Sequence, residues 1–337
     1  MGLEDGPLGF GLKVTRISRT GVVKQCSAAP NLLSLKSFIK HGIRRSINND
    51  TFGYWFPAYF GADSQERTLH LAKKSLSFIM TNRTDKFQVE QVGKVLLKAM
   101  FTVILRIVDE KLVPCTDFVR QIVYFHSLML LFIKVYPQIV EEIDSEIEKF
   151  LKDKANRTKD ALDNLGLILV YSLFSEKYSF SDIAQTYFEE QLDRQVFWIL
   201  LKIPELDDTK NYGNVILDDN RVEITFMSQI ISYLLVIFFH DYRKVLRNNF
   251  KTWSSMLDFL EQHGCKLETK VEDEILKTFN DAKANVKSYS SYFQRIGLPD
   301  KNQQELNNML KQAVKNSREK RYHGDVDHVI GLPSEDK

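Results

Sequence analysis

Apolar side chains recur every three or four residues through most of this chain, the spacing that places them on one face of an α-helix. The longest such stretches are residues 63–81, 92–107, 138–152 and 179–203. The first and last begin at a capping residue, the third follows Pro137, and the last ends before Pro204. Residues 114–136 are apolar on almost every side, so we expect them to form a central, buried helix. The pattern predicts an all-α fold, an irregular helical array of the HEAT or armadillo kind or a bundle.

Shorter stretches with the same spacing predict the remaining helices, near residues 31–41, 158–175, 222–246, 251–263, 267–285 and 301–321. In residues 8–26, apolar and polar side chains instead alternate weakly around a turn at Gly21, which predicts a small N-terminal β-hairpin. Asp63 and Glu66 have the spacing of a reciprocal helix cap for residues 63–81.

A polar segment rich in Asp and Asn, residues 205–221, is the clearest boundary in the chain. The sequence therefore predicts five consecutive parts. They are a β-hairpin and lead-in over residues 1–30, a main helical domain over 31–204, a linker over 205–221, a second helical lobe over 222–322 and a frayed tail over 323–337.

The connector after the 31–41 helix is rich in aromatic side chains. Six of them fall within nine positions: Phe52, Tyr54, Trp55, Phe56, Tyr59 and Phe60. Each ring buries roughly 150–250 Å², so we expect this aromatic connector to fill a groove between the following helices. Any of these rings that stays exposed would be a contact residue for a partner.

The charges nearly balance, with 46 Lys and Arg against 44 Asp and Glu, and the net charge of +2 does not call for a nucleic-acid or acidic-membrane partner. Three widely spaced cysteines imply no disulfide framework and favour a reducing compartment. The N-terminus lacks the basic and apolar parts of a signal peptide, and the most apolar window, residues 224–239, is too short to span a bilayer. We expect no membrane partner and a cytoplasmic or nuclear location.

The candidate catalytic and metal-binding residues lack the partners that such chemistry needs. His126 lies in the most apolar segment with no acidic residue three or four positions away, which indicates a core histidine. His240 and Asp241 are adjacent, so on a helix their side chains do not face one another. Two further groups lack the spacing of a metal site: His263 with Cys265, and His323 and His328 with Asp325 and Asp327. We expect no catalytic residue, no metal site and no cofactor; an enzyme whose helical active site is not visible in the sequence is an alternative.

Charged residues suggest two kinds of surface. Glu189, Glu190, Asp193 and Arg194 project from one helix, where a solvated face with ion pairs between successive turns is expected. Two basic patches would support nucleic-acid binding, a second alternative: Lys36, Lys40, His41, Arg44 and Arg45, and Lys311, Lys315, Arg318, Lys320 and Arg321. The near-neutral balance and the expected burial of the neighbouring rings argue against a nucleic-acid partner.

Several segments together resemble a known kind of protein region: residues 31–38, 41–46, 54–57 followed by Glu66 and Arg67, 125–128 and 192–199. They are similar to a helical region found after a ubiquitin-conjugating-enzyme-like domain in large multidomain eukaryotic proteins, over about residues 8–297. The resemblance implies a helical companion module in a ubiquitin-pathway protein. The chain has no His-Pro-Asn tripeptide, and its three cysteines, Cys26, Cys115 and Cys265, do not lie in the conjugating enzymes' active-site context. The resemblance therefore implies no catalytic residue.

These observations predict a non-enzymatic helical scaffold or protein-interaction module, linked to ubiquitin conjugation and acting on a protein partner. Its expected contact residues are the exposed members of the aromatic connector and two charged sites. The candidates are Arg44, Arg45, Tyr54, Trp55, Phe56, Tyr59, Asp193 and Arg194.

Overall fold

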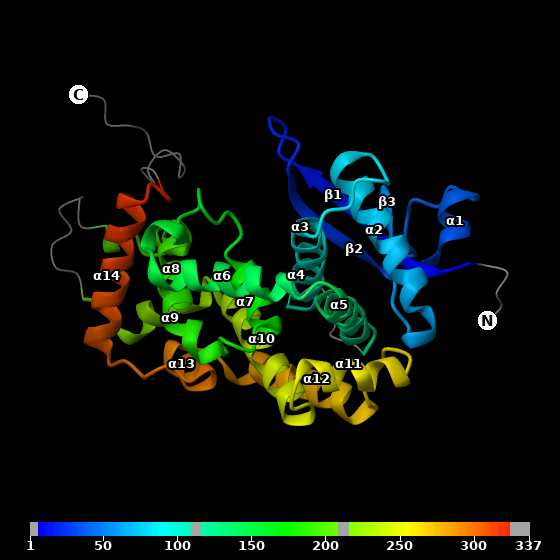
Figure 1. Ribbon diagram of the computed structural model, residues 1–337. Helices are drawn as coiled ribbons and strands as arrows, with labels where there is room; N and C mark the ends of the chain where they lie inside the picture. The colour runs from blue at the N-terminus through cyan, green and yellow to red at the C-terminus, as the bar shows by residue number, and fades with distance from the viewer. Residues whose placement is uncertain (1–5, 109–115, 208–215, 324–337) are drawn as a thin grey trace. The chain divides into compact units, whose positions relative to one another are not determined.

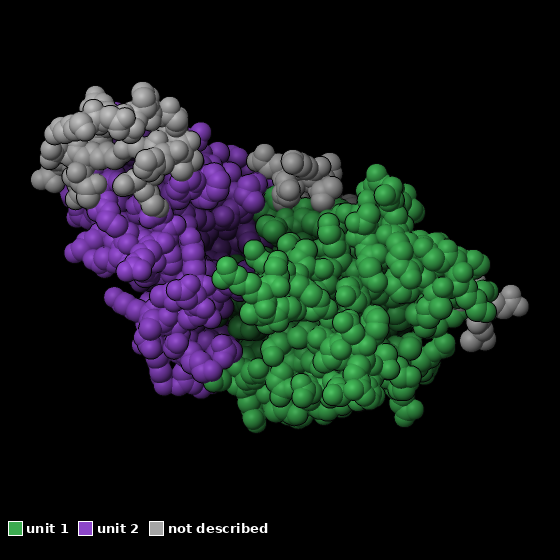
Figure 2. Space-filling view, turned by 90° about the horizontal axis from the view of Figure 1, so that it is seen from above, with its two compact units in different colours: residues 1–145, 166–175, 241–280 green, residues 146–165, 176–240, 281–337 purple. Residues whose placement is uncertain are grey.

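The computed structural model describes residues 6–108, 116–207 and 216–323 of the 337-residue chain (Figure 1). The described residues are mostly helical, with a small antiparallel sheet near the N-terminus, so the predicted helical character is confirmed. Their contacts separate two compact units (Figure 2). Unit 1 consists of residues 1–145, 166–175 and 241–280, and unit 2 of residues 146–165, 176–240 and 281–337. The units interleave along the chain, whereas the division expected from the sequence followed chain order.

The sheet of unit 1 has three antiparallel strands in the order β2-β1-β3: β1 (Leu8–Arg16), β2 (Val23–Ser34) and β3 (Tyr54–Pro57). β1 and β2 form the predicted hairpin, and the aromatic connector supplies β3, whose Phe56 pairs with Phe10. An isolated two-stranded hairpin is marginal in water. The connector supplies the third strand that completes the sheet. We had expected it only to fill a groove between helices.

The helix expected over residues 31–41 is shorter, because the first of these residues belong to β2. Leu32, Leu33 and Ser34 pair with β1. Helix α1 (Leu35–Ile39) begins only after Ser34, whose hydroxyl accepts a hydrogen bond from the Ser37 N–H at 3.0 Å. The helical spacing of the leucines was thus outweighed by strand pairing with a distant part of the chain.

The outer edge of β2 is covered by polar side chains of a helix. On α4 (Lys98–Val108), Lys98 donates to the Val23 carbonyl at 2.6 Å, Thr102 to the Cys26 carbonyl at 2.7 Å, and Arg106 to the Ala28 carbonyl at 3.1 Å. An uncovered strand edge would present such groups to other chains. α4 therefore closes this side of the sheet.

The helices of unit 1 follow most of the predicted boundaries. They are α2 (Gln65–Thr81), α3 (Glu90–Val92), η2 (Gly93–Leu97), α4, α5 (Thr116–Val135), the start of α6 (Gln138–Lys152), α7 (Gly166–Phe174), the end of α10 (Ile230–Asn249), α11 (Trp253–Gln262) and most of α12 (Thr269–Asn285). α5 is buried along nearly its whole length, as expected of a central helix. Pro114, expected at its start, lies outside the described residues.

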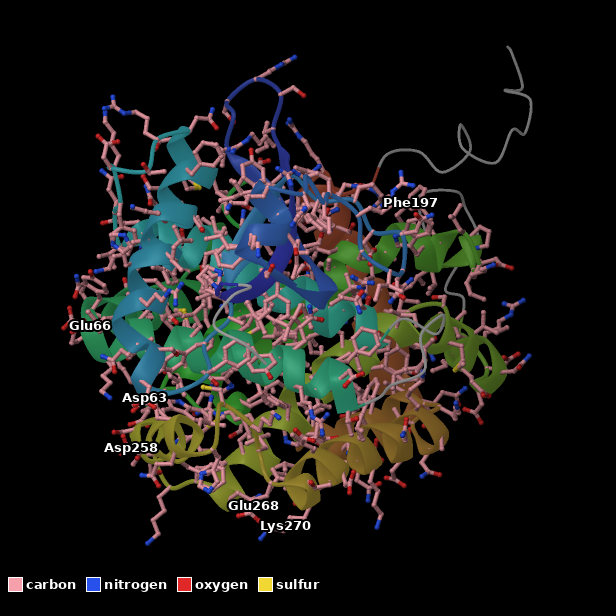
Figure 3. The ribbon with its side chains drawn as sticks, turned by 90° about the vertical axis from the view of Figure 1, so that its right-hand side faces the viewer. Asp63, Glu66, Phe197, Asp258, Glu268 and Lys270 are labelled. Carbon is pink, nitrogen blue, oxygen red and sulfur yellow. The ribbon has the colours of Figure 1, made fainter. Side chains whose placement is uncertain are left out.

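Two local expectations for helix starts were wrong. α2 begins at Gln65 after a 3₁₀ turn, η1 (Ala62–Ser64), and Asp63 and Glu66 lie at the surface and form no reciprocal cap (Figure 3). The helix expected from residue 158 begins at Gly166. A Cβ at Gly166 would lie 2.1 Å from the ring of Phe101, so this close approach fixes where the segment enters the core of unit 1.

Unit 2 is built on the long helix α8 (Phe180–Leu200), which begins after Ser179, at the start expected from the sequence, and is capped reciprocally by Ser179 and Asp182. Its other elements are the end of α6, η3 (Lys154–Arg157), η4 (Pro204–Leu206), α9 (Asp219–Met227), the start of α10, the end of α12, α13 (Tyr289–Ile296) and α14 (Gln303–Glu319). Part of the expected linker, residues 208–215, and the tail from residue 324 onward lie outside the described residues.

The single helix expected over residues 222–246 is broken. α9 and α10 meet at an angle of 69°. The bend brings the ring of Phe226 parallel to that of Tyr233, with centroids 4.7 Å apart. In a straight helix, residues seven positions apart are separated by about 10 Å along the axis. The stacked pair therefore requires the bend.

One helix of the described residues, α5, is long and apolar enough to cross a membrane, and the bent pair α9 and α10 passes the same test together. Of the apolar window in α5, 78% is buried inside the protein. A core helix has this character, so the composition of α5 is explained by its place in unit 1.

Candidate functional site

A short hairpin after α1 is largely exposed. Gly42, with φ +63°, turns the chain after the helix, and residues 44–52 then fold back on themselves. The Phe52 N–H donates to the Arg44 carbonyl at 3.0 Å, and the Ser46 N–H donates to the Asp50 carbonyl at 2.9 Å. The tip of this hairpin is therefore formed by the residues around Ile47.

The hairpin is fixed to the body of unit 1 at its base. Arg106 of α4 forms a salt bridge with Asp50 at 3.1 Å. The ring of Phe52 stacks on Phe38 of α1, with centroids 6.3 Å apart. It also lies over β1, where a Cβ at Gly11 would approach it to 2.3 Å. These contacts hold the hairpin in one place against the sheet.

The fixed hairpin presents apolar side chains to solvent. Ile47 is 89% exposed, Ile39 at the end of α1 is 66% exposed, and Ile43 between them is also exposed. Single exposed apolar residues are common on protein surfaces. Three exposed isoleucines within nine positions, at the end of α1, before the hairpin and at its tip, are not explained by packing. We call α1 and residues 40–53 the α1–hairpin surface.

The same region concentrates positive charge. Residues 6–49 contain eight Lys and Arg and no Asp or Glu, in a chain whose net charge is only +2. On the α1–hairpin surface, Lys40, His41, Arg44 and Arg45 are exposed. Such a local excess attracts acidic partners through a field that extends about 10 Å at moderate ionic strength.

Arg44 and Arg45, both predicted contact residues, line a shallow pocket of about 310 Å³ with Lys13 of β1. Thr51, Phe52 and Gly53 complete this cationic pocket. The Arg44 guanidinium lies 3.6 Å from the centroid of the Phe38 ring and donates to the Phe38 carbonyl at 2.5 Å. Within the described part of the chain, no carboxylate lies within ion-pair distance of these three cations.

The aromatic connector does not form an exposed surface. Trp55, Phe56 and Tyr59 are buried, and only Tyr54 among the four predicted contact rings is partly accessible. The Trp55 indole donates to the Leu33 carbonyl at 3.0 Å, and the Tyr59 hydroxyl donates to Glu261 at 2.8 Å. These rings hold strands and helices of unit 1 together and are not available to a partner. Their burial also removes the stacking platform on which the nucleic-acid alternative depended.

Asp193 and Arg194, the other predicted contact residues, lie inside unit 2. Arg194 donates to Glu190 at 2.8 Å and to the carbonyls of Arg157 and Leu162 at 2.6 and 2.7 Å. Those carbonyl bonds hold the segment before residue 166 in a non-helical path. The expected ion pairing between turns is present in the pair of Arg194 with Glu190, but the expected solvated face was wrong, because these charges are largely buried.

A pocket of about 500 Å³ lies between α8 and α14, beside this network. Glu190, 1% exposed, accepts hydrogen bonds from Lys320 at 2.5 Å and from the Tyr322 hydroxyl at 2.7 Å. Lys320 also donates to Asp193 at 2.8 Å, and burial raises the pKa of the Asp193 carboxyl. The charges of this wall compensate one another. Lys320, which belongs to the second basic patch, is therefore paired with carboxylates inside unit 2.

His126, Cys26 and Cys265, which were considered as catalytic candidates, are buried in the core of unit 1. His126 is buried, its Nδ1 lies 3.1 Å from the Tyr242 hydroxyl, and burial lowers its pKa to about 3. Burial raises the pKa of the Cys26 and Cys265 thiols to about 12, so neither is a ready nucleophile. Among the described residues, no group of three His, Cys, Asp or Glu side chains could hold a metal ion. Cys115, His328, Asp325 and Asp327 lie outside the described residues.

No model of a known protein family matches the chain, and no curated protein matches its sequence. The resemblance to a region that accompanies ubiquitin-conjugating domains therefore stays a prediction.

Two features of the surface were missed in the sequence. The absence of acidic residues between Gly6 and Asn49 could have been seen there, but the balanced total charge concealed it. Trp198 on α8 is 57% exposed beside Phe197, whose position Figure 3 shows. Helical spacing placed Trp198 next to core residues of α8 and gave no signal of its exposure.

Proposed function

We propose that this chain is a non-enzymatic helical scaffold that binds a protein partner through the α1–hairpin surface of unit 1. One observation carries the proposal: the α1–hairpin surface presents exposed isoleucines beside Arg44 and Arg45, which have no acidic partner among the described residues. A scaffold of this kind needs no active site. Its helices form an irregular array whose role is to hold the hairpin in position.

The surface defines the chemistry of the partner. Ile47 stands at a convex tip, so the partner must offer an apolar pocket to receive it. Arg44 and Arg45 flank the isoleucines, so the rim of that pocket must carry Asp or Glu side chains. Rim charges mainly set the rate of association and its salt dependence, and the apolar contact mainly sets the lifetime of the complex.

The proposed link to ubiquitin conjugation is supported by the resemblance of residues 31–38 and 41–46, which include α1 and the start of the hairpin. The proposal places the protein in the cytoplasm or nucleus, where that pathway operates. It includes no membrane or nucleic-acid partner.

Binding of the full chain to purified ubiquitin and to a panel of purified ubiquitin-conjugating enzymes, measured by biolayer interferometry, tests this function. We expect at least one of them to bind, and Arg45→Glu and Ile47→Asp each to weaken binding by about tenfold or more. Lys270→Glu is the matched control, because it reverses an exposed charge on α12 of the same unit, away from α1 (Figures 1 and 3). Absence of binding to the whole panel contradicts the pathway, and equal binding by all variants contradicts the surface.

A further inference from the structure

In the described part of unit 1, three cations without an ion pair line the cationic pocket, whereas several other cations are paired. Arg106 pairs with Asp50, Arg120 with Glu272 and Lys134 with Glu261. Within the described residues, the charges of Lys13, Arg44 and Arg45 have no carboxylate within ion-pair distance. Like charges gathered around one pocket repel one another unless an anion joins them.

The pocket is organised before any ligand arrives. Two carbonyls, those of Phe38 and Ile43, accept hydrogen bonds from one terminal nitrogen of Arg44 at 2.5 and 2.9 Å, and the guanidinium stacks on the Phe38 ring. Stacking and bonding in this way reduce the rotamer freedom that Arg44 would lose on binding. The Gly53 N–H donates to the Leu12 carbonyl at 3.1 Å, which fixes the floor of the pocket to β1 beside Lys13.

The number of cations indicates the class of anion. A carboxylate has one negative charge, whereas a phosphorylated side chain has about −1.5 to −2 charges and three acceptor oxygens at neutral pH. Two arginines and one lysine match the second group, since guanidinium forks bind phosphate oxygens in pairs. The volume of about 310 Å³ is at the lower end of the range for small ligands and is sufficient for a phosphoryl group with the side chain that carries it.

The surroundings favour a protein as the carrier of the phosphate. Single-stranded nucleic acid is held by stacking on exposed rings, but Phe52 of this pocket is buried and Trp55 nearby is inside unit 1. Membrane-inserting loops commonly carry Trp or Tyr at the interface, and residues 39–50 contain neither. The apolar tip at Ile47 instead suits a partner with a pocket of its own.

We propose that the cationic pocket binds a phosphorylated side chain of the partner protein, so that phosphorylation of the partner controls its binding. This inference rests on the proposed function for the identity of the partner, but not for the affinity of the pocket for phosphate. The phosphoryl group contacts Lys13, Arg44 and Arg45. The isoleucines of the α1–hairpin surface contact the residues that flank it.

Methyl NMR of the full chain, labelled at Ile and Thr methyl groups, tests the pocket directly. The probe is doubly capped phosphoserine, compared with doubly capped glutamate, inorganic phosphate, an oligo-dT strand and phosphatidylcholine vesicles containing phosphatidylserine. We expect saturable shifts of the Thr51 methyl signal with capped phosphoserine, and an affinity at least about fivefold lower for capped glutamate. Inorganic phosphate should shift the same signal more weakly, because it lacks the side chain.

Arg45→Gln and Lys13→Gln should each abolish the Thr51 shift, and Lys270→Gln should leave it unchanged. Unaltered Ile methyl spectra of the variants establish that they fold. Equal affinity for capped glutamate, binding of only the oligonucleotide or the vesicles, or full binding by Arg45→Gln would each overturn the inference. If capped phosphoserine binds but no ubiquitin-pathway protein does, the phosphate site is supported and the proposed partner class is contradicted. If a ubiquitin-pathway protein binds through this surface but capped phosphoserine does not, the proposed function is supported and the phosphate site is contradicted.

Discussion

Arg106 on α4 reaches Asp50 at 3.1 Å, while another nitrogen of the same guanidinium donates to the Ala28 carbonyl of β2 at 3.1 Å. One side chain thus joins the helix, the sheet and the exposed hairpin of unit 1. Phe52 and Arg44 also hold the hairpin, through their contacts with Phe38 of α1. The pair is thus one of several anchors of the hairpin.

Asp50→Asn should loosen the hairpin without unfolding unit 1. Both side chains are partly exposed, so we expect a loss of only about 0.5–1 kcal/mol in the free energy of unfolding. The amide hydrogens of Ser46 and Phe52, bonded across the hairpin, should exchange faster with solvent. Asp85→Asn, in the exposed pair with Arg83, is the control and should leave their exchange unchanged. Unchanged exchange in Asp50→Asn would mean that Phe52 and Arg44 fix the loop without the pair.

Trp55→Ala should destabilise unit 1 strongly. The indole is 5% exposed and donates to the Leu33 carbonyl, so its removal leaves both a cavity and an unpaired carbonyl. We expect a loss of about 3–5 kcal/mol in the free energy of unfolding. The control is Trp198→Ala on α8, which removes a tryptophan side chain that is 57% exposed. It should lower the free energy of unfolding by no more than about 0.5 kcal/mol. Urea denaturation of both variants measures the difference, and similar losses would contradict the assigned burial.

The fold could be predicted from the sequence where contacts are local. The apolar faces of α6 and α8 and the start of α8 near Ser179 depend on residues within one helix, and these were correct. The third strand was missed because β3 pairs with β1 across a long separation in the chain. The break between α9 and α10 was missed for a similar reason, since it is stabilised by the stacking of Phe226 on Tyr233 across the bend.

The candidate site could be predicted only in part. Arg44 and Arg45 were identified as contact residues from their charge, but their proximity to Lys13 depends on the hairpin lying against β1. The burial of the aromatic connector followed from the size of its rings. The pair of Arg194 with Glu190 one turn earlier matches the ion pairing expected along this helix. The burial of these charges could not be predicted, because Asp193 and Arg194 find further partners in segments distant along the chain.

His126 should make the stability of unit 1 depend on pH. Burial lowers its pKa from 6.5 to about 3, so between these values the unfolded chain binds a proton that the folded unit does not. Stability is therefore lost as the pH falls, by up to about 1.4 kcal/mol per pH unit. His126→Gln should remove this contribution, whereas His70→Gln, at an exposed site of α2, should not. Denaturation of the three proteins at pH 7 and pH 5 measures it, and the same pH dependence in all three would exclude His126 as its source.

Lys320→Met should destabilise unit 2, because Glu190 and Asp193 would remain buried without their shared cation. Breaking a buried pair costs about 3–5 kcal/mol, and we expect about 2–3 here because Lys320 is 22% exposed. Lys315→Met, at an exposed position of α14 just before Lys320, is the control and should change stability little. Hydrogen exchange of α8 in the full chain measures the change in unit 2.

The pH dependence of that loss has a definite sign. The pKa of Asp193 is already raised by burial, and removal of Lys320 should raise it further. A carboxyl whose pKa is higher in the folded state binds a proton on folding, so the variant should regain stability as the pH falls through that pKa. Adding Asp193→Asn to Lys320→Met should restore part of the loss at neutral pH for the same reason. A loss in Lys320→Met that is independent of pH, and is not reduced by Asp193→Asn, would show that the lysine acts through its methylene packing and not through its charge.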